Sequence, residues 1–241
     1  MSNVGQIERK AQNHVVGLFR ERLGYDYLGN WQDREGNANI ELQLLETNLE
    51  RRGYGVVHIG KAVDRLKSDA SLGSGRELYE ANQDVYRLLR YGVQVKPEAG
   101  HVNDTVWLID WENPEANDFA VAEEVTVRGQ NDKRPDLVLY VNGIAFGTIE
   151  LKRSTVSVAE GIRQTIGNQQ SEFIRPFFTT VQMVMAGNDV EGLRYAAIDT
   201  KKEHWLAWKE PSEIKEPLDR ALTQLASAGT IQPETRSASL E

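Results

Sequence analysis

Three residues within the stretch "KRPDLVLYVNGIAFGTIELKR" (residues 133–153) could do chemistry together: Asp136, Glu150 and Lys152. The stretch is otherwise apolar and is typical of a buried β-hairpin, in which an ionised group is costly unless it is paired or binds a metal. Mg²⁺ is commonly held by one or two carboxylates. A nearby ammonium can hold an attacking water or stabilise charge that develops on phosphorus. This set therefore suits metal-dependent phosphodiester hydrolysis.

The same residues also have a purely structural interpretation. Asp136 would then be a turn acid after Pro135, and Glu150 with Lys152 would be the solvated end of a strand. Short acid–acid–lysine patterns arise often by chance, so spacing alone does not choose between the two interpretations.

The hairpin turn decides whether the two acids share a face. Asn142-Gly143 between two apolar runs is a strong hairpin signal. With a two-residue loop, Asp136 faces Ile149, and Glu150 points to the opposite side of the sheet.

A three-residue loop over 141–143, with a left-handed bulge at the glycine, instead places Asp136 opposite Thr148. Both acids and Lys152 then lie on one face, and the acids are diagonal neighbours roughly 7 to 8 Å apart at the backbone. We predict this register because it collects a core-like set on the reverse face: Leu137, Leu139, Ala145, Ile149 and Leu151.

Periodicity predicts the elements around this hairpin. Helices are expected at 7–23, 39–53, 58–70 and in 71–91 after a Gly/Ser linker, and later at 157–174 and 213–226. Strands are expected at 93–97, 105–111, 119–129, 179–187 and 193–199. This order predicts an α/β fold, close to α+β, with a central mixed sheet flanked by helices.

We predict one domain over residues 1–230. It consists of a mostly helical portion, 1–91, and a sheet core, 92–230, that contains the hairpin 136–152. The polar tail, 231–241, is expected to be disordered or an artificial addition.

Composition narrows the class of protein. The chain has 241 residues and no cysteine, which excludes disulfides and thiolate metal sites. No signal peptide or membrane-spanning run is apparent, so we expect a soluble, cytoplasmic protein. The net charge of −8 argues against a general polyanion binder. A basic cleft can still exist locally, because several cations lie close to the motif in sequence: Arg128, Lys133, Arg134, Lys152, Arg153 and Arg163.

The stretch "RPDLVLYVNGIAFGTIELKR" resembles the signature of the PD-(D/E)xK nuclease superfamily, as it occurs in the N-terminal nuclease domain of type I restriction enzyme R (HsdR) subunits. The similarity extends over nearly the whole chain, in order, through segments such as "NIELQLLETNL", "VWLIDWENPEANDFAV", "GIRQTIGNQQSEFI" and "HWLAWKE". The resemblance implies a restriction-endonuclease-like core and a Mg²⁺-dependent DNA endonuclease.

By this resemblance, Asp136 and Glu150 are the metal ligands and Lys152 is the catalytic lysine. Family members also carry Gln-x-x-x-Tyr on the following helix. Gln164 matches the glutamine, but Asn168 stands where the tyrosine is expected. Gln164 is therefore a candidate catalytic residue, whereas its structural interpretation is an exposed polar residue on a helix.

The resemblance also implies partners: double-stranded DNA and the modification and specificity subunits of a restriction complex. ATP would serve only the translocase of a full-length R subunit, and no GxxxxGK[ST] motif occurs in this sequence. Two alternatives stay open. The chain could be a non-catalytic DNA-binding or subunit-docking module that keeps the nuclease fold, or a nuclease with other DNA substrates. Glu8 is either an additional acid near the metal or a solvated acid at a helix start.

Overall fold

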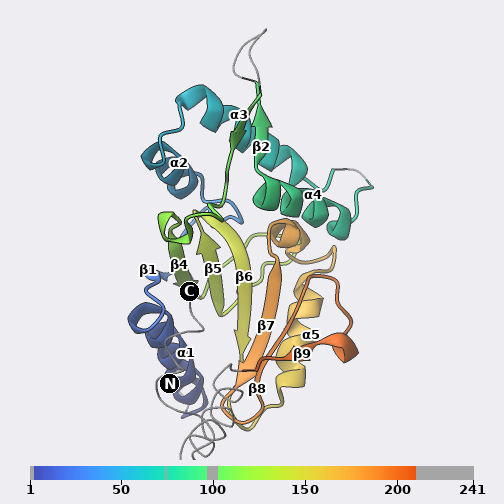
Figure 1. Cartoon of the computed structure of the whole chain (residues 1–241). Helices are drawn as coiled ribbons and strands as arrows, with labels where there is room; N and C mark the ends of the chain where they lie inside the picture. The colour runs from blue at the N-terminus through green and yellow to red at the C-terminus, as the bar shows by residue number, and fades with distance from the viewer. Residues whose placement is uncertain (1–2, 74, 97–102, 210–241) are drawn as a thin grey trace, which may run out of the picture. The chain divides into compact units, whose positions relative to one another are not determined.

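A seven-stranded mixed β-sheet forms the centre of the molecule, seen in a computed structural model that describes residues 3–73, 75–96 and 103–209 (Figure 1). The strand order is β1-β4-β5-β6-β7-β8-β9. The β1–β4 and β6–β7 pairs are parallel, and the β4–β5, β5–β6 and β7–β8 pairs are antiparallel. The strands are β1 (Asp26–Asn30), β4 (Phe119–Glu123), β5 (Leu137–Val141), β6 (Ile144–Leu151), β7 (Met183–Asn188), β8 (Gly192–Ala196) and β9 (Leu206–Ala207). The predicted α/β class with a mixed sheet is confirmed.

Helices α1 (Asn3–Glu21) and α5 (Val158–Asn168) cover opposite faces of this sheet (Figure 1). Ile162 of α5 packs in a core with Val138 and Val184, whereas Val16 of α1 packs in another with Leu137. Alternate residues of one strand thus reach the two cores, as the pleat requires. Neighbouring residues in the middle of a strand therefore alternate between the α1 face and the α5 face.

A helical portion packs against the turn end of the β5–β6 hairpin. It contains α2 (Leu42–Arg51), α3 (Val56–Asp69), α4 (Leu78–Tyr91) and a small sheet of β2 (Val93–Val95) with β3 (Asp104–Val106). Its core includes Val141 and Ile144 from the hairpin. Short 3₁₀ helices lie at Pro114–Ala116, Arg175–Thr179 and Lys202–His204. The four helices predicted in the first ninety residues are confirmed.

Several predicted boundaries are wrong. Strand β1 was not predicted, because its residues show no alternation of buried and exposed positions. The strand expected over 105–111 ends at Val106, and the one expected over 119–129 ends at Glu123, where the next residue takes a left-handed φ of 53°. The strand expected over 179–187 begins at Met183. The predicted helix 213–226 and tail 231–241 lie outside the described residues.

The predicted hairpin register is also wrong. The turn is a two-residue loop, since Val141 pairs with Ile144, and the extra residue is Phe146 inside β6 rather than the glycine of the turn. Beyond this bulge Leu137 pairs with Ile149, so the next residues outward, Asp136 and Glu150, stand directly opposite each other. The two acids share a face as predicted, but as direct neighbours rather than diagonal ones. The bulge also moves Ala145, expected on the reverse face, onto the α5 face.

Contacts with the helical portion explain the tight turn. Asn142 and Gly143 have φ values of 51° and 78°, as a type I′ turn requires. A Cβ on Gly143 would lie 2.7 Å from the Glu41 carbonyl oxygen and 2.7 Å from Leu44 Cβ, so the approach of α2 admits only glycine. A looser three-residue loop would displace the hairpin from this packing.

Candidate active site

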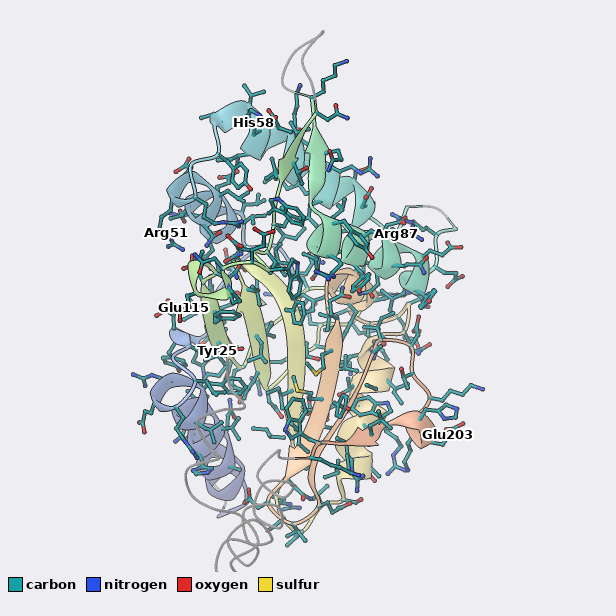
Figure 2. The ribbon with its side chains drawn as sticks, viewed as in Figure 1. Tyr25, Arg51, His58, Arg87, Glu115 and Glu203 are labelled. Atoms are coloured by element: carbon teal, nitrogen blue, oxygen red, sulfur yellow. The ribbon has the colours of Figure 1, made fainter. Side chains whose placement is uncertain are left out.

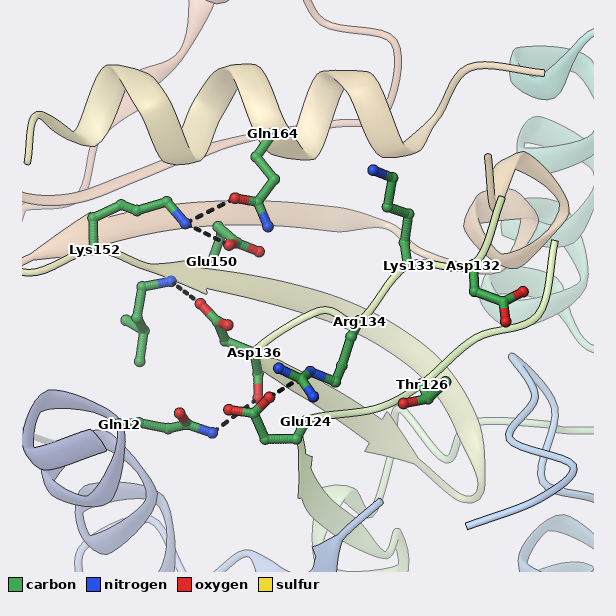
Figure 3. Close-up of a pocket in the computed structure, with 11 residues that line it drawn as sticks. Gln12, Glu124, Thr126, Asp132, Lys133, Arg134, Asp136, Glu150, Lys152 and Gln164 are labelled. Atoms are coloured by element: carbon green, nitrogen blue, oxygen red, sulfur yellow. Dashed lines mark hydrogen bonds and ion pairs between the residues drawn. The ribbon is translucent and has the colours of Figure 1, made fainter. Parts of the chain in front are cut away.

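The four predicted site residues come together at the open end of the β5–β6 hairpin (Figure 3). Asp136 precedes β5, Glu150 lies in β6, Lys152 follows β6, and Gln164 lies on α5. They line a cavity of about 480 Å³. The opposite wall is the segment after β4, which contributes Glu124, Thr126, Asp132, Lys133 and Arg134.

Short hydrogen bonds fix the positions of these side chains. The Leu151 backbone N–H donates to Asp136 Oδ2 (2.7 Å). The Lys152 ammonium donates to Glu150 Oε1 (2.6 Å) and to Gln164 Oε1 (2.8 Å). Gln164 therefore orients Lys152 over the carboxylates, although the Gln164 residue is exposed at the cavity.

A close approach of α5 makes this arrangement possible. Ser157 caps the helix, its hydroxyl accepting a hydrogen bond from the Ala159 N–H. Gly161 faces the sheet, where an added Cβ would lie 3.4 Å from Lys152 Cγ and 3.5 Å from Glu150 Cγ. The closest contact of that Cβ would be with Ala186 of β7, at 3.2 Å, whereas its contacts with the two side chains of the site would be of ordinary van der Waals length.

The two carboxyl groups are electrostatically strained. Burial raises the pKa of Asp136 to about 6, although the Leu151 N–H and the charge of Lys152 oppose the shift. Burial and the neighbouring charge of Asp136 raise the pKa of Glu150 to about 8. Glu150 is only 3% exposed, and one lysine does not neutralise two carboxylates. An additional cation between them would offset this penalty.

The donor set fits a magnesium ion. Two adjacent carboxylates open to a cavity, and Mg²⁺ usually takes one or two carboxylates and keeps water or phosphate oxygens as its other ligands. Across the part of the chain that the structure describes, no group of three or more His, Asp or Glu side chains forms a denser metal cluster. Only the backbone of Glu8 is described, within α1, so its proposed role stays a prediction.

Sequence patterns missed a second set of residues beside the site. Gln12 of α1 is 8% exposed, and its amide donates to Glu123 Oε2 (3.3 Å) and to the Asp136 carbonyl oxygen (3.4 Å). Glu123 also accepts a hydrogen bond from the Tyr27 hydroxyl (2.7 Å). Gln12 lies on a long helix far away in sequence, and no local pattern distinguishes it from other polar helix residues.

The structure places only some of the other predicted candidates at the cavity. Of the neighbouring cations, Lys133 and Arg134 line the cavity, whereas Arg128 does not. Asn168, at the position of the missing tyrosine, is buried at 4% exposed and is not among the lining residues. The amide of Gln164, not the residue one turn later, contacts Lys152.

Comparison with known proteins agrees with the resemblance. The chain is 34% identical over 136 residues to a putative type I restriction enzyme endonuclease subunit (MjaVIIIP) of Methanocaldococcus jannaschii, covering 55% of this chain and 13% of the relative. It is 25% identical over 184 residues to the type I restriction enzyme HindI endonuclease subunit of Haemophilus influenzae, covering 72% of this chain and 17% of the relative. The chain thus matches less than a fifth of the length of each.

None of the helices in the described ranges is both long and apolar enough to cross a membrane.

Residues 6–203 match the family described as "Type I restriction enzyme R protein N terminus". The chain belongs to this family of type I restriction enzyme R proteins.

Proposed function

We propose that this chain is a Mg²⁺-dependent nuclease domain that hydrolyses phosphodiester bonds of double-stranded DNA, as part of a type I restriction R subunit. One observation carries the proposal: Asp136 and Glu150 stand directly opposite each other with Lys152 bonded to Glu150, all open to one cavity. The PD-(D/E)xK superfamily assignment is part of the same proposal, supported by the order of these three residues along the chain.

Each residue has a defined task in this proposal. Asp136 and Glu150 hold the ion, and the N–H of Leu151 keeps the Asp136 carboxylate turned toward Glu150. A bound divalent ion would supply a more acidic water and an electrophile for the phosphate oxygens. Lys152 presents its ammonium to the attacking water and to charge that develops on phosphorus. Gln164 acts through Lys152, so it is a positioning residue.

The partners proposed here follow from the family. In a type I restriction enzyme, modification and specificity subunits would locate the target, and an ATP-driven motor would lie outside the part of the R subunit matched here. The relatives are named as endonuclease subunits and are several times longer than this chain. Sequence specificity is therefore not expected in this domain.

A plasmid-nicking assay tests the proposal. The parent chain should nick supercoiled DNA with Mg²⁺ or Mn²⁺ but not with EDTA, Asp136→Asn should abolish the activity, and Lys152→Ala should reduce it strongly. Asp189→Asn is the matched control, because Asp189 is an exposed turn acid and its replacement removes the same charge. Cleavage that persists in Asp136→Asn would contradict the proposal. Absence of metal-dependent cleavage in the parent, together with DNA binding, would favour the non-catalytic module.

A further inference from the structure

A second ion pair lies on the cavity wall opposite Lys152. Arg134 Nε is 2.7 Å from Glu124 Oε2, and both residues line the cavity (Figure 3). The Glu124 backbone N–H donates to the Asp136 carbonyl oxygen (2.8 Å), so Glu124 is the neighbour of Asp136 on the side away from Glu150. The pair therefore lines the same cavity as the proposed metal ligands.

The backbone at Glu124 is held in an unusual conformation. Its φ of 53° lies in the left-handed region, which costs energy for residues other than glycine. Such strain persists where the surroundings require it and is concentrated at functional sites. Here it lies directly after β4, where the chain leaves the sheet, and the segment that follows pairs back on itself through the Val127–Lys133 bridge. The strained residue thus lies at the start of the segment that forms the basic wall.

The two members of the pair differ in exposure. The Arg134 side chain is 46% exposed, whereas the Glu124 side chain is 18% exposed. A partly exposed ion pair is weak, because solvent screens it and two side chains must be ordered. An arginine fork also fits a phosphate well, since it can donate two parallel hydrogen bonds. For Arg134, exchange of the Glu124 carboxylate for a DNA phosphate therefore requires little rearrangement.

Three other nearby cations differ from Arg134. Lys133 also lines the cavity, but its ammonium lies over the Phe173 ring, 4.0 Å from the ring centroid. Lys152 is 17% exposed and bonds to both Glu150 and Gln164, so its position within the proposed chemistry is fixed. Arg128 is 78% exposed and pairs with Asp132, but it does not line the cavity. Arg134 combines exposure, a weak partner and a place on the cavity wall.

We propose that Arg134 binds a backbone phosphate of the DNA and that Glu124 is the partner it gives up on binding. In the DNA-free protein Glu124 keeps the guanidinium over the cavity, and its charge lowers the affinity for a polyanion. This inference rests on the proposed function only for the class of substrate, DNA. The chain has a net charge of −8, which repels DNA overall. The availability of each cation at the cavity therefore affects how readily DNA binds there.

Binding of a fluorescein-labelled duplex by the whole chain in EDTA, followed by anisotropy, tests the exchange without cleavage. Arg134→Ala should weaken binding about tenfold and reduce the slope of log affinity against log salt by about 1. Arg134→Lys should restore the slope but only part of the affinity, because lysine lacks the fork. Arg87→Ala is the matched control and should change binding much less, because Arg87 is an exposed arginine of α4 that pairs with Asp84, and neither residue lines the cavity.

The partner exchange makes a separate prediction for Glu124. Glu124→Gln should tighten binding about threefold, the size expected for release of a partly exposed pair. The gain should vanish when Arg134→Ala is combined with it, because Glu124 would act through Arg134. Glu115→Gln removes the same charge from an exposed residue that does not line the cavity and should not reproduce the gain.

The outcomes separate this inference from the proposed function. If the parent binds DNA but Arg134→Ala binds equally well, the inference is wrong and the nuclease proposal is untouched. A gain from Glu124→Gln that survives in the double variant would overturn the exchange and indicate a general charge effect. Failure of the parent to bind DNA at low salt would also overturn the inference, whereas the nuclease proposal is judged by nicking with metal.

Discussion

The two ends of the β5–β6 hairpin both bury polar side chains, but they do so in opposite ways. At the turn, Asn142 is completely buried, and its side chain accepts from the Asp118 N–H and donates to the Leu108 carbonyl and to Asn117 Oδ1. At the open end, Asp136 and Glu150 are buried beside each other with raised pKa values. Figure 2 shows the side chains around both ends of the hairpin.

This difference indicates that the turn end of the hairpin has a structural role and the open end a functional one. The neutral amide at the turn has its hydrogen bonds satisfied, so it contributes to stability and needs nothing more. The two carboxyl groups have one lysine between them, so without a metal the second negative charge is relieved only by a proton, as the raised pKa values indicate. Buried charge that the fold leaves uncompensated indicates a ligand of opposite charge.

The largest expected effect is on catalysis at the open end. Lys152→Ala should reduce the rate of metal-dependent cleavage about 10²- to 10³-fold, the size found for loss of one group that stabilises transition-state charge. Single-turnover nicking at saturating Mn²⁺ measures it, with circular dichroism to verify folding. Because the metal ligands are intact, Mn²⁺ binding should be retained. A rate within threefold of the parent would remove Lys152 from the mechanism.

Substitutions at the turn should change the stability of the protein rather than catalysis. Asn142→Ala removes three hydrogen bonds, to Asp118, Leu108 and Asn117, and places alanine at a positive φ, so we expect a loss of about 2 to 4 kcal/mol in the free energy of unfolding. Asn142→Gly relieves the backbone but still loses the hydrogen bonds, so it should fall between the alanine variant and the parent. Urea denaturation measures both. An Asn142→Ala variant as stable as the parent would contradict the structural role assigned to the turn end of the hairpin.

The pH dependence of stability should come from the open end. Because the folded-state pKa values of Asp136 and Glu150 are raised, to about 6 and 8, the folded protein binds their protons more tightly than the unfolded chain does. Without metal, this contribution is present below about pH 4 and is lost as pH rises to about 8. Because each unit of pKa shift corresponds to about 1.4 kcal/mol, the loss should be on the order of several kcal/mol.

Urea denaturation in EDTA at several pH values measures this loss. Asp136→Asn removes one of the two charges and should flatten the profile, whereas Asp189→Asn should leave it unchanged. A parent protein that becomes more stable from pH 5 to pH 8 in EDTA would contradict the assigned pKa shifts.

The smallest expected effect concerns the orientation of Lys152. Gln164→Ala removes one hydrogen bond to the ammonium and leaves the bond to Glu150, so cleavage should fall about tenfold or less. Gln164→Glu keeps an acceptor and should retain more activity than alanine near neutral pH. Rates measured with saturating metal separate positioning from metal binding. Equal rates for alanine and parent would assign Gln164 to the helix surface alone.

Sequence alone predicted the composition of the site better than its geometry. The residue types and the family resemblance singled out Asp136, Glu150 and Lys152, which the structure brings together, but the predicted register was wrong, since Gly147 inside the strand is only a weak sign of the bulge at Phe146. The tight turn depends on the approach of α2 to Gly143, which is a tertiary contact. Gln12 and Glu124 escaped prediction for a similar reason, because their significance depends on packing between distant segments.

Binding of a divalent ion at the open end tests the central claim most directly. Isothermal titration of the parent chain with Mn²⁺ should show binding that strengthens from pH 5.5 to pH 8, as Asp136 and Glu150 lose their protons. Asp136→Asn should abolish this binding, and Asp189→Asn should preserve it. Equal binding by the parent and Asp136→Asn, or none by the parent at pH 8, would contradict the account.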